Sequence, residues 1–129
     1  MDRVEVLRDV YREWGRGNYR AGLELYDPEL TLEIHSPIPE AGVYEGLTGL
    51  RRYMNEFLGT WEDYEIRAED IQEEGDTVVV SVHHGGRASG APVEADFVTA
   101  WTFDGDRVVR LDSAQDRETA LAAARKSGA

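Results

Sequence analysis

The chain has 129 residues, of which 41% are hydrophobic and 31% charged, and its 26 acidic and 14 basic side chains give a net charge of −12. This length predicts one domain over residues 1–129, with a tail at 126–129 that frays, and the negative charge argues against nucleic acid and anionic membranes as partners. With no cysteine, no apolar run near the ~20 residues of a membrane span and no signal-peptide pattern, we expect a cytoplasmic protein without disulfides or a cysteine nucleophile.

Two helices are expected before residue 28. Asp2 followed by Glu5 matches a capping box, and apolar residues then recur at helical spacing as far as Trp14. A second, shorter helix is predicted from a cap at Asn18 to the Asp-Pro pair at 27–28, because the residue before a proline disfavours helix.

A strand of alternating character follows and ends at His35. Successive strand residues point to opposite sides, so polar Thr31, Glu33 and His35 share one face while the leucines and isoleucine between them share the other. A proline-rich elbow at 36–46 comes next. The apolar residues of 47–61 then recur at helical spacing and predict another helix.

The second half changes to strand patterns near 62–73, 77–88, 92–103 and 107–115, joined by short turns, with a last helix capped by Asp116. Short connections make these strands antiparallel neighbours. Together the elements predict an α+β domain shaped like a cone, in which a curved, mainly antiparallel sheet wraps around about three N-terminal helices and leaves a hollow.

One strand is apolar on both faces. Phe97, Thr99 and Trp101 share one face, and Val98, Ala100 and Thr102 share the other. We expect the first face to meet the helices and the hollow and the second to meet a partner subunit, which predicts a homodimer through the sheet.

Three stretches carry a family resemblance: S-P-I-P-E-A-G-V-Y-E-G at 36–46, W-T-F-D-G-D-R-V-V-R at 101–110 and D-R-E-T-A-L at 116–121. With the element order, they resemble the SnoaL-like branch of the nuclear transport factor 2-like superfamily. That superfamily includes ketosteroid isomerases, polyketide cyclases and limonene-epoxide hydrolase, and also members that only bind or assemble. The resemblance implies a cone with a deep apolar pocket, commonly dimeric.

The resemblance also suggests which positions bear the chemistry. Tyr11 and His35 match the places where ketosteroid isomerases carry an oxyanion-stabilising tyrosine and a proton-transferring carboxylate, and Thr99 matches the second oxyanion donor. The water-positioning asparagine of limonene-epoxide hydrolase corresponds to His35, and its last-strand aspartate to Ser113. The carboxylates of these relatives are thus replaced.

His35 and Tyr11 are therefore the predicted catalytic residues. An imidazole titrates near neutral pH and can take a proton from a carbon acid and return it, and the tyrosine would stabilise the resulting oxyanion. The alternatives are a solvent-facing histidine that pins the loop and a core tyrosine whose hydroxyl finds a backbone partner.

The predicted walls of the pocket come from several elements. His83 and His84 are adjacent and must point to opposite faces, so only one of them enters it. No metal-binding spacing occurs, and neither a metal nor a cofactor is expected. The predicted substrate-binding residues are Trp14, Glu33, Tyr44, Met54, Phe57, His83, Phe97, Thr99, Trp101 and Ser113.

Three interpretations of the function stay open on the sequence. The first is an isomerase or cyclase that transfers a proton on a small apolar carbonyl compound. The second is a module that binds a hydrophobic ligand or assembles as a dimer without catalysis. The third is a purely structural dimer whose cone is filled by side chains.

Overall fold

A computed structural model of the chain describes residues 1–37 and 41–127. The elements in chain order are α1 (Arg3–Gly15), the 3-10 turn η1 (Leu23–Leu25), β1 (Tyr26–Ile34), β2 (Gly42–Glu45), α2 (Gly46–Thr60), β3 (Glu62–Glu74), β4 (Thr77–Ala88), β5 (Ala91–Asp104), β6 (Arg107–Ala114) and α3 (Arg117–Ser127). Fraying is expected for residues 126–129. Of these, 126 and 127 belong to α3, and 128 and 129 lie outside the described residues.

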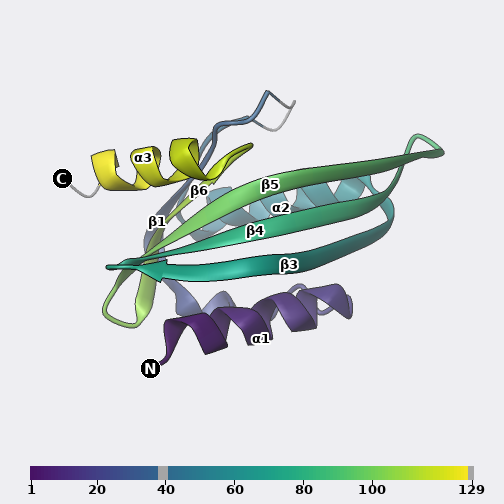
Figure 1. Cartoon of the computed structure of the whole chain (residues 1–129). Coiled ribbons are helices and arrows are strands. Elements are labelled where there is room, and N and C mark those ends of the chain that lie inside the picture. The colour runs from purple at the N-terminus through teal and green to yellow at the C-terminus, as the bar shows by residue number, and fades with distance from the viewer. Residues whose placement is uncertain (38–40, 128–129) are drawn as a thin grey trace.

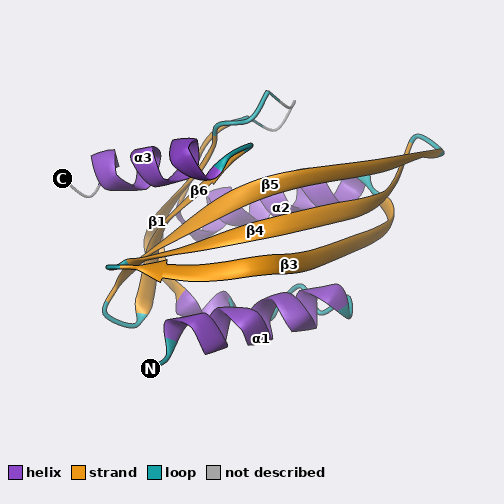
Figure 2. Cartoon of the chain, in the orientation of Figure 1, coloured by secondary structure: helices purple, strands orange, loops and turns teal. Residues whose placement is uncertain are grey.

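The six described strands form one open, curled sheet in the order β2-β1-β6-β5-β4-β3. All neighbouring pairs are antiparallel except β1 and β6, which run parallel. Figure 2 shows the long strands β3, β4 and β5 curving together, with helices on both sides of the sheet. The predicted α+β fold with a mainly antiparallel sheet is confirmed.

The helices cover both faces of the sheet (Figure 1). α1 packs against β3, and α2 packs against β1 and β2. α3 lies on the opposite face, against β4, β5 and β6. The prediction that the N-terminal helices gather inside the curled sheet therefore holds for α1 and α2, and the C-terminal helix α3 backs the sheet from outside.

Two hydrophobic clusters follow from this arrangement. The larger one joins α1 and the inner face of the sheet and includes Leu7, Val80 and Trp101, all almost fully buried. The smaller one joins Val98 and Ala100 of β5 to Ala120, Leu121 and Ala124 of α3. The outward apolar residues that predicted a partner subunit are thus covered by the chain itself.

The second predicted helix is wrong. Only one 3-10 turn forms, and strand β1 begins at Tyr26. Gly22 adopts φ +87°, and a Cβ there would lie 3.1 Å from the Val10 side chain, so the chain turns tightly back onto α1 instead of continuing as a helix. Pro28 is accommodated within β1, where the pairing with β6 is irregular between Tyr26 and Thr31.

Strand β2 was not predicted from the sequence. This short strand lies in the second part of the elbow and pairs antiparallel with β1, with Leu32 opposite Tyr44. Helix α2 then starts directly at Gly46. Residues 38–40 of the elbow lie outside the described residues, so the predicted elbow is described only at its two ends.

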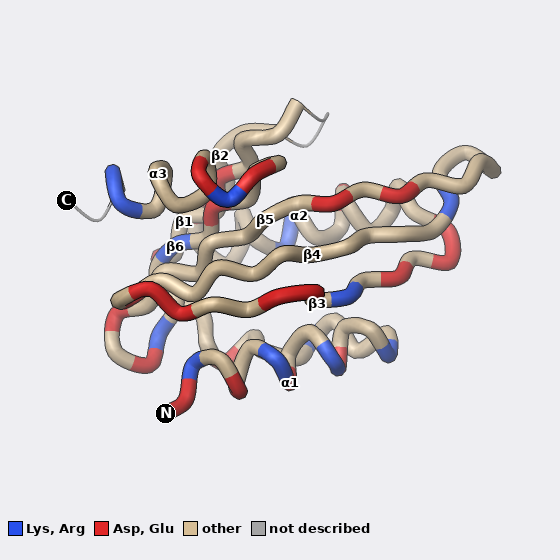
Figure 3. The backbone as a smooth tube through the Cα atoms, viewed as in Figure 1, with Lys and Arg blue, Asp and Glu red and all other residues tan. Residues whose placement is uncertain are grey.

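Charge is concentrated at the edges of the sheet and on the helices (Figure 3). Strand β4, which lies next to the edge strand β3, carries no Asp or Glu, and its one Lys or Arg residue is Arg87, near its end. Within residues 1–37 and 41–127, no helix is long and apolar enough to cross a membrane.

Candidate functional site

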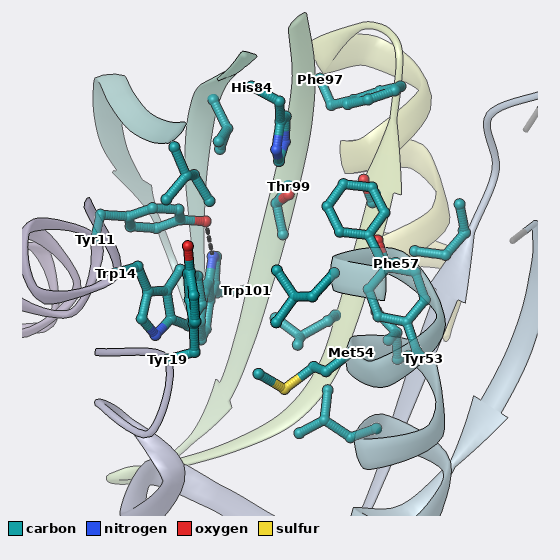
Figure 4. Close-up of a pocket in the computed structure, with 18 of the residues that line it drawn as sticks. Tyr11, Trp14, Tyr19, Tyr53, Met54, Phe57, His84, Phe97, Thr99 and Trp101 are labelled. Carbon is teal, nitrogen blue, oxygen red and sulfur yellow. Dashed lines mark hydrogen bonds between the residues drawn. The ribbon is translucent and has the colours of Figure 1, made fainter. Parts of the chain in front are cut away.

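A cavity of about 120 Å³ lies between α1, α2 and the inner face of the sheet. A cavity of similar size, ~150 Å³, holds one benzene ring in another protein. The walls, drawn in part in Figure 4, are mostly aromatic and aliphatic, and none of the described lining residues has an acidic, lysine or arginine side chain. The lining residues are Tyr11, Trp14, Tyr19, Tyr26, Leu32, Ile34, Leu50, Tyr53, Met54, Phe57, Leu58, Tyr64, Ile66, Val82, His84, Phe97, Thr99, Trp101, Leu111 and Ser113.

The cavity has a buried floor and a half-exposed mouth. Tyr26, Leu111 and Trp101 are almost fully buried at the floor. Tyr19 after α1 and Tyr53 of α2 are only half-buried. A ligand would therefore place its apolar part inside and keep its other end near these two tyrosines.

The first polar group on the wall centres on Tyr11. The Trp101 indole Nε1–H donates to the Tyr11 hydroxyl oxygen at 3.0 Å, and the same hydroxyl also bonds to the Thr99 side chain. Burial raises the pKa of Tyr11 far above its ordinary value, an effect that these two hydrogen bonds oppose. Tyr11 thus stays a neutral hydroxyl that can donate a hydrogen bond.

The second polar group is a tyrosine–histidine pair at the other end of the aromatic wall. The Tyr64 hydroxyl lies 2.5 Å from His84 Nδ1, and the two rings stack with centroids 5.8 Å apart. Phe57 and Phe97 contact the imidazole edge-on, at 5.6 Å and 5.4 Å between centroids. Burial, with a smaller effect from His83, lowers the pKa of His84 to about 4, so its ring is neutral at physiological pH.

His35 lies on the other side of the sheet. Ile34 and Leu32 line the cavity, and because strand residues alternate, Glu33 and His35 point to the opposite face. The His35 Nε2 lies 2.9 Å from Asp112 Oδ1, and its Nδ1 lies 3.7 Å from Glu33 Oε2. The prediction that places this imidazole in the pocket is therefore wrong.

His35 belongs instead to a partly buried ionic cluster that joins β1 to β6. Asp112 is fully buried, and the Arg110 guanidinium donates to both of its carboxylate oxygens at 2.9 Å and to Glu33 at 2.6 Å. Glu33, His35 and Asp112 lie close enough together to bind a metal ion. The Arg110 guanidinium already bonds to both carboxylates and balances one of their two negative charges, which favours a structural ion-pair network.

Two further predicted wall residues lie elsewhere. His83 points outward, where its Nδ1 lies 2.7 Å from Asp96 Oδ1 and its Nε2 lies 3.5 Å from Glu94. The hydrogen bond to Asp96 raises the pKa of His83. Tyr44 is buried against Tyr53 of α2, behind the cavity wall, with the Arg52 guanidinium over its ring. Since adjacent strand residues alternate, the histidine that enters the pocket is His84.

The other predicted wall residues do line the cavity: Tyr11, Trp14, Met54, Phe57, Phe97, Thr99, Trp101 and Ser113. Sequence reasoning missed Tyr19, Tyr26, Tyr53, Tyr64 and His84. The parity of β4 could have identified His84, because Val78, Val80 and Val82 share its face and all three are buried. Because Val79 on the other face is also apolar, the sequence of β4 does not show an alternation of apolar and polar residues.

Comparison with known proteins matches the profile of the SnoaL-like domain family to residues 7–111. No curated protein matches. Among solved structures, that of TerC co-crystallised with polyporic acid has a TM-score of 0.75 at 17% identity, with 95% of each chain covered.

Two further solved structures have similar folds. A putative SnoaL-like polyketide cyclase from Jannaschia has a TM-score of 0.72 at 22% identity, covering 95% of this chain and 88% of that one. A hypothetical protein from Catenulispora acidiphila with a ketosteroid isomerase-like fold, in complex with trimethylamine, has a TM-score of 0.71 at 17% identity, covering 92% and 90%. At these identities the likeness is one of fold.

Proposed function

The chain belongs to the SnoaL-like domain family, and on that premise we propose that its pocket binds a small, uncharged, oxygen-bearing molecule and supports isomerase- or cyclase-type chemistry at a carbonyl group of that molecule. The observation that carries the proposal is the Tyr11 hydroxyl, held by Trp101 inside a cavity walled by aromatic rings.

The walls favour a neutral ligand. A bound ion would lose its hydration and find no opposite charge on the described lining residues, which costs several kcal/mol. An aromatic or alicyclic ring fits the volume and contacts the rings of Trp14, Phe57 and Trp101. The ligands named for two structural neighbours, polyporic acid and trimethylamine, support small-molecule binding in this fold.

Tyr11 supplies the chemistry in this proposal. When a proton leaves the carbon next to a carbonyl, negative charge develops on the carbonyl oxygen. The Tyr11 hydroxyl would donate to that oxygen, while the Trp101 N–H bond to the phenol oxygen strengthens the donor. The Thr99 hydroxyl, also bonded to Tyr11, donates to the same phenol oxygen, since this bond lowers the Tyr11 pKa, and it helps to hold the hydroxyl in place.

Binding without turnover is the second candidate. It is favoured by the position of His35, the base expected from sequence, which bonds to Asp112 behind the sheet and does not line the cavity. Dimerisation also stays a proposal. Val98 and Ala100, which suggested it, pack under α3, so light scattering at micromolar concentration is its direct check.

Native mass spectrometry of the purified protein tests the proposed function. We expect a co-purifying neutral organic molecule, or binding of added acetophenone, that is weakened at least fivefold by Tyr11→Phe. Turnover of the identified molecule, lowered by the same substitution, would select the enzyme over the passive binder. A protein that binds neither a co-purified molecule nor single-ring ketones would contradict the proposal.

A further inference from the structure

The second polar group of the pocket, His84 with Tyr64, has no role in the function proposed above. Of the described lining residues, His84 is the only histidine, and Figure 4 shows its nitrogen-bearing edge turned into the pocket toward Thr99. It comes from β4, whereas Tyr64 comes from β3 and Phe97 from β5. Adjacent strands of the sheet thus build one side of this group.

The bond to Tyr64 determines which nitrogen of His84 carries the proton. Because the imidazole is neutral, one ring nitrogen accepts and the other donates. A phenol is the better donor and an unprotonated imidazole nitrogen the better acceptor, so the Tyr64 hydroxyl donates to Nδ1 across the 2.5 Å contact. The proton of the imidazole then sits on Nε2.

The hydrogen bond given for the partly buried His84 ring involves Nδ1, and the ring contacts around it are aromatic, from Phe57, Tyr64 and Phe97. An N–H group that turns toward an apolar wall instead of an acceptor loses the net gain of a hydrogen bond, about 0.5–1.5 kcal/mol. A ligand oxygen at this place would satisfy it.

We propose that His84, held in its Nε2–H form by Tyr64, is a neutral hydrogen-bond donor that binds a carbonyl or hydroxyl oxygen of the ligand. The inference rests on the proposed function and adds a specificity determinant to it. His84 is a ligand-binding residue, and Tyr64 is a positioning residue that acts through it.

The placement of the two groups then describes the ligand. Thr99, bonded to Tyr11, pairs with Val80, which lies four residues before His84 on β4, so the two groups occupy different stretches of the same wall. A molecule with two oxygen acceptors, one near each end of an apolar body, would satisfy both donors. A dicarbonyl or hydroxy-ketone compound has this pattern, and a pure hydrocarbon does not.

Nitrogen NMR of protein labelled in its three histidines tests the inference directly. His35→Gln and His83→Gln variants assign the His84 signals. We expect His84 to be in the neutral Nε2–H form from pH 5.5 to 8, and Tyr64→Phe to convert it to a mixture of the two neutral forms. A charged ring, or an Nδ1–H form in the wild type, would overturn the proposal.

Acetophenone and ethylbenzene provide a matched pair of single-ring probes that differ in the carbonyl oxygen. In the Tyr11→Phe variant, where the competing hydroxyl is gone, we expect acetophenone to shift the Nε2–H proton downfield and ethylbenzene to leave it in place. Adding His84→Phe to the Tyr11→Phe variant should then remove most of the difference in affinity between acetophenone and ethylbenzene.

The two proposals fail in different ways. If both probes bind but acetophenone leaves the Nε2–H signal unmoved, the inference about His84 is wrong and the proposed pocket function stands. If neither probe binds the wild-type protein, the proposed function is wrong, and the inference that rests on it falls with it.

Discussion

The Trp101 indole N–H donates a 3.0 Å hydrogen bond to the Tyr11 hydroxyl and so links the first helix to the centre of the sheet. The two residues are 90 positions apart in sequence, and both are buried. The ring of Trp14, one turn after Tyr11, lies 6.0 Å from the Trp101 ring and completes an aromatic corner at the cavity floor. This corner positions the tyrosine hydroxyl both for folding and for ligand contact.

Tyr11→Phe should therefore lower stability as well as ligand binding. It leaves the buried Trp101 N–H without its acceptor, which costs about 1–3 kcal/mol of unfolding free energy. Urea denaturation measures this loss. Tyr19→Phe, at the half-exposed mouth, is the matched control and should change stability by less than about 0.5 kcal/mol. Equal effects of the two substitutions would show that the Trp101 bond adds nothing.

His35→Gln should leave the pocket intact. Because the His35 ring bonds to Asp112 on the face of the sheet away from the cavity, we expect the affinity for acetophenone to stay within about twofold of the wild type. Titration followed by ligand-observed NMR measures it. A loss of affinity as large as that of Tyr11→Phe would show that the His35 ring contacts the ligand, and it would contradict the arrangement described above.

The strand that ends at His35 shows how far sequence reasoning reached. Its alternation correctly separated Leu32 and Ile34 from Glu33 and His35. The apolar set faces the cavity, so the same alternation already implied that the imidazole looks away from it. Family resemblance at that position outweighed the strand parity, and the parity was right.

Long-range contacts account for what the sequence could not predict. The apolar outer face of β5 is covered by α3, and no local pattern tells a strand buried under its own terminal helix from one buried in a dimer. Likewise, the partner of His84 is Tyr64 on the neighbouring strand, and that contact lies where the register shifts between Glu62 and Glu65. The fold class and eight of the twenty described lining residues, in contrast, follow from periodicity and family resemblance.

Asp112→Asn should be strongly destabilising. The carboxylate is fully buried and holds both Arg110 and His35, so its removal leaves the partly buried guanidinium with Glu33 as its remaining charged partner among the described residues. Breaking one partner of a buried ion pair costs about 3–5 kcal/mol. Urea denaturation is again the measurement, and Asp106→Asn in the exposed β5–β6 turn is the control. A loss below about 1 kcal/mol would mean that the cluster is not a structural ion-pair network.

Leu121→Ala tests the packing of α3 against the outer face of the sheet. Leu121 is buried with Val98 and Ala100, and truncation of a buried leucine costs about 2–5 kcal/mol. Thermal unfolding should show a lower Tm. A substitution without effect would indicate that α3 does not hold to the sheet in solution, and light scattering of the same variant would then show whether a partner subunit occupies the uncovered face.

The acid side of the stability curve should depend on His84. Its pKa in the folded protein is about 4, below the ordinary value of 6.5, so the unfolded chain binds a proton over a range of pH in which the folded protein does not. The contribution of the neutral imidazole to the unfolding free energy is complete above pH 6.5 and is lost as the pH falls toward 4. The difference between the two pKa values corresponds to roughly 3 kcal/mol of unfolding free energy.

Wild type and His84→Gln should therefore differ most between pH 6.5 and 4, where unfolding free energies from urea titrations fall more steeply for the wild type. His83→Gln is the matched control. The hydrogen bond that the His83 ring donates to Asp96 raises the pKa of His83, so its contribution to stability is present at low pH and lost as the pH rises. Removing it therefore leaves the acid-side fall in place. Parallel curves for wild type and His84→Gln would mean that the imidazole is solvated, and the neutral donor proposed for the pocket would then lose its basis.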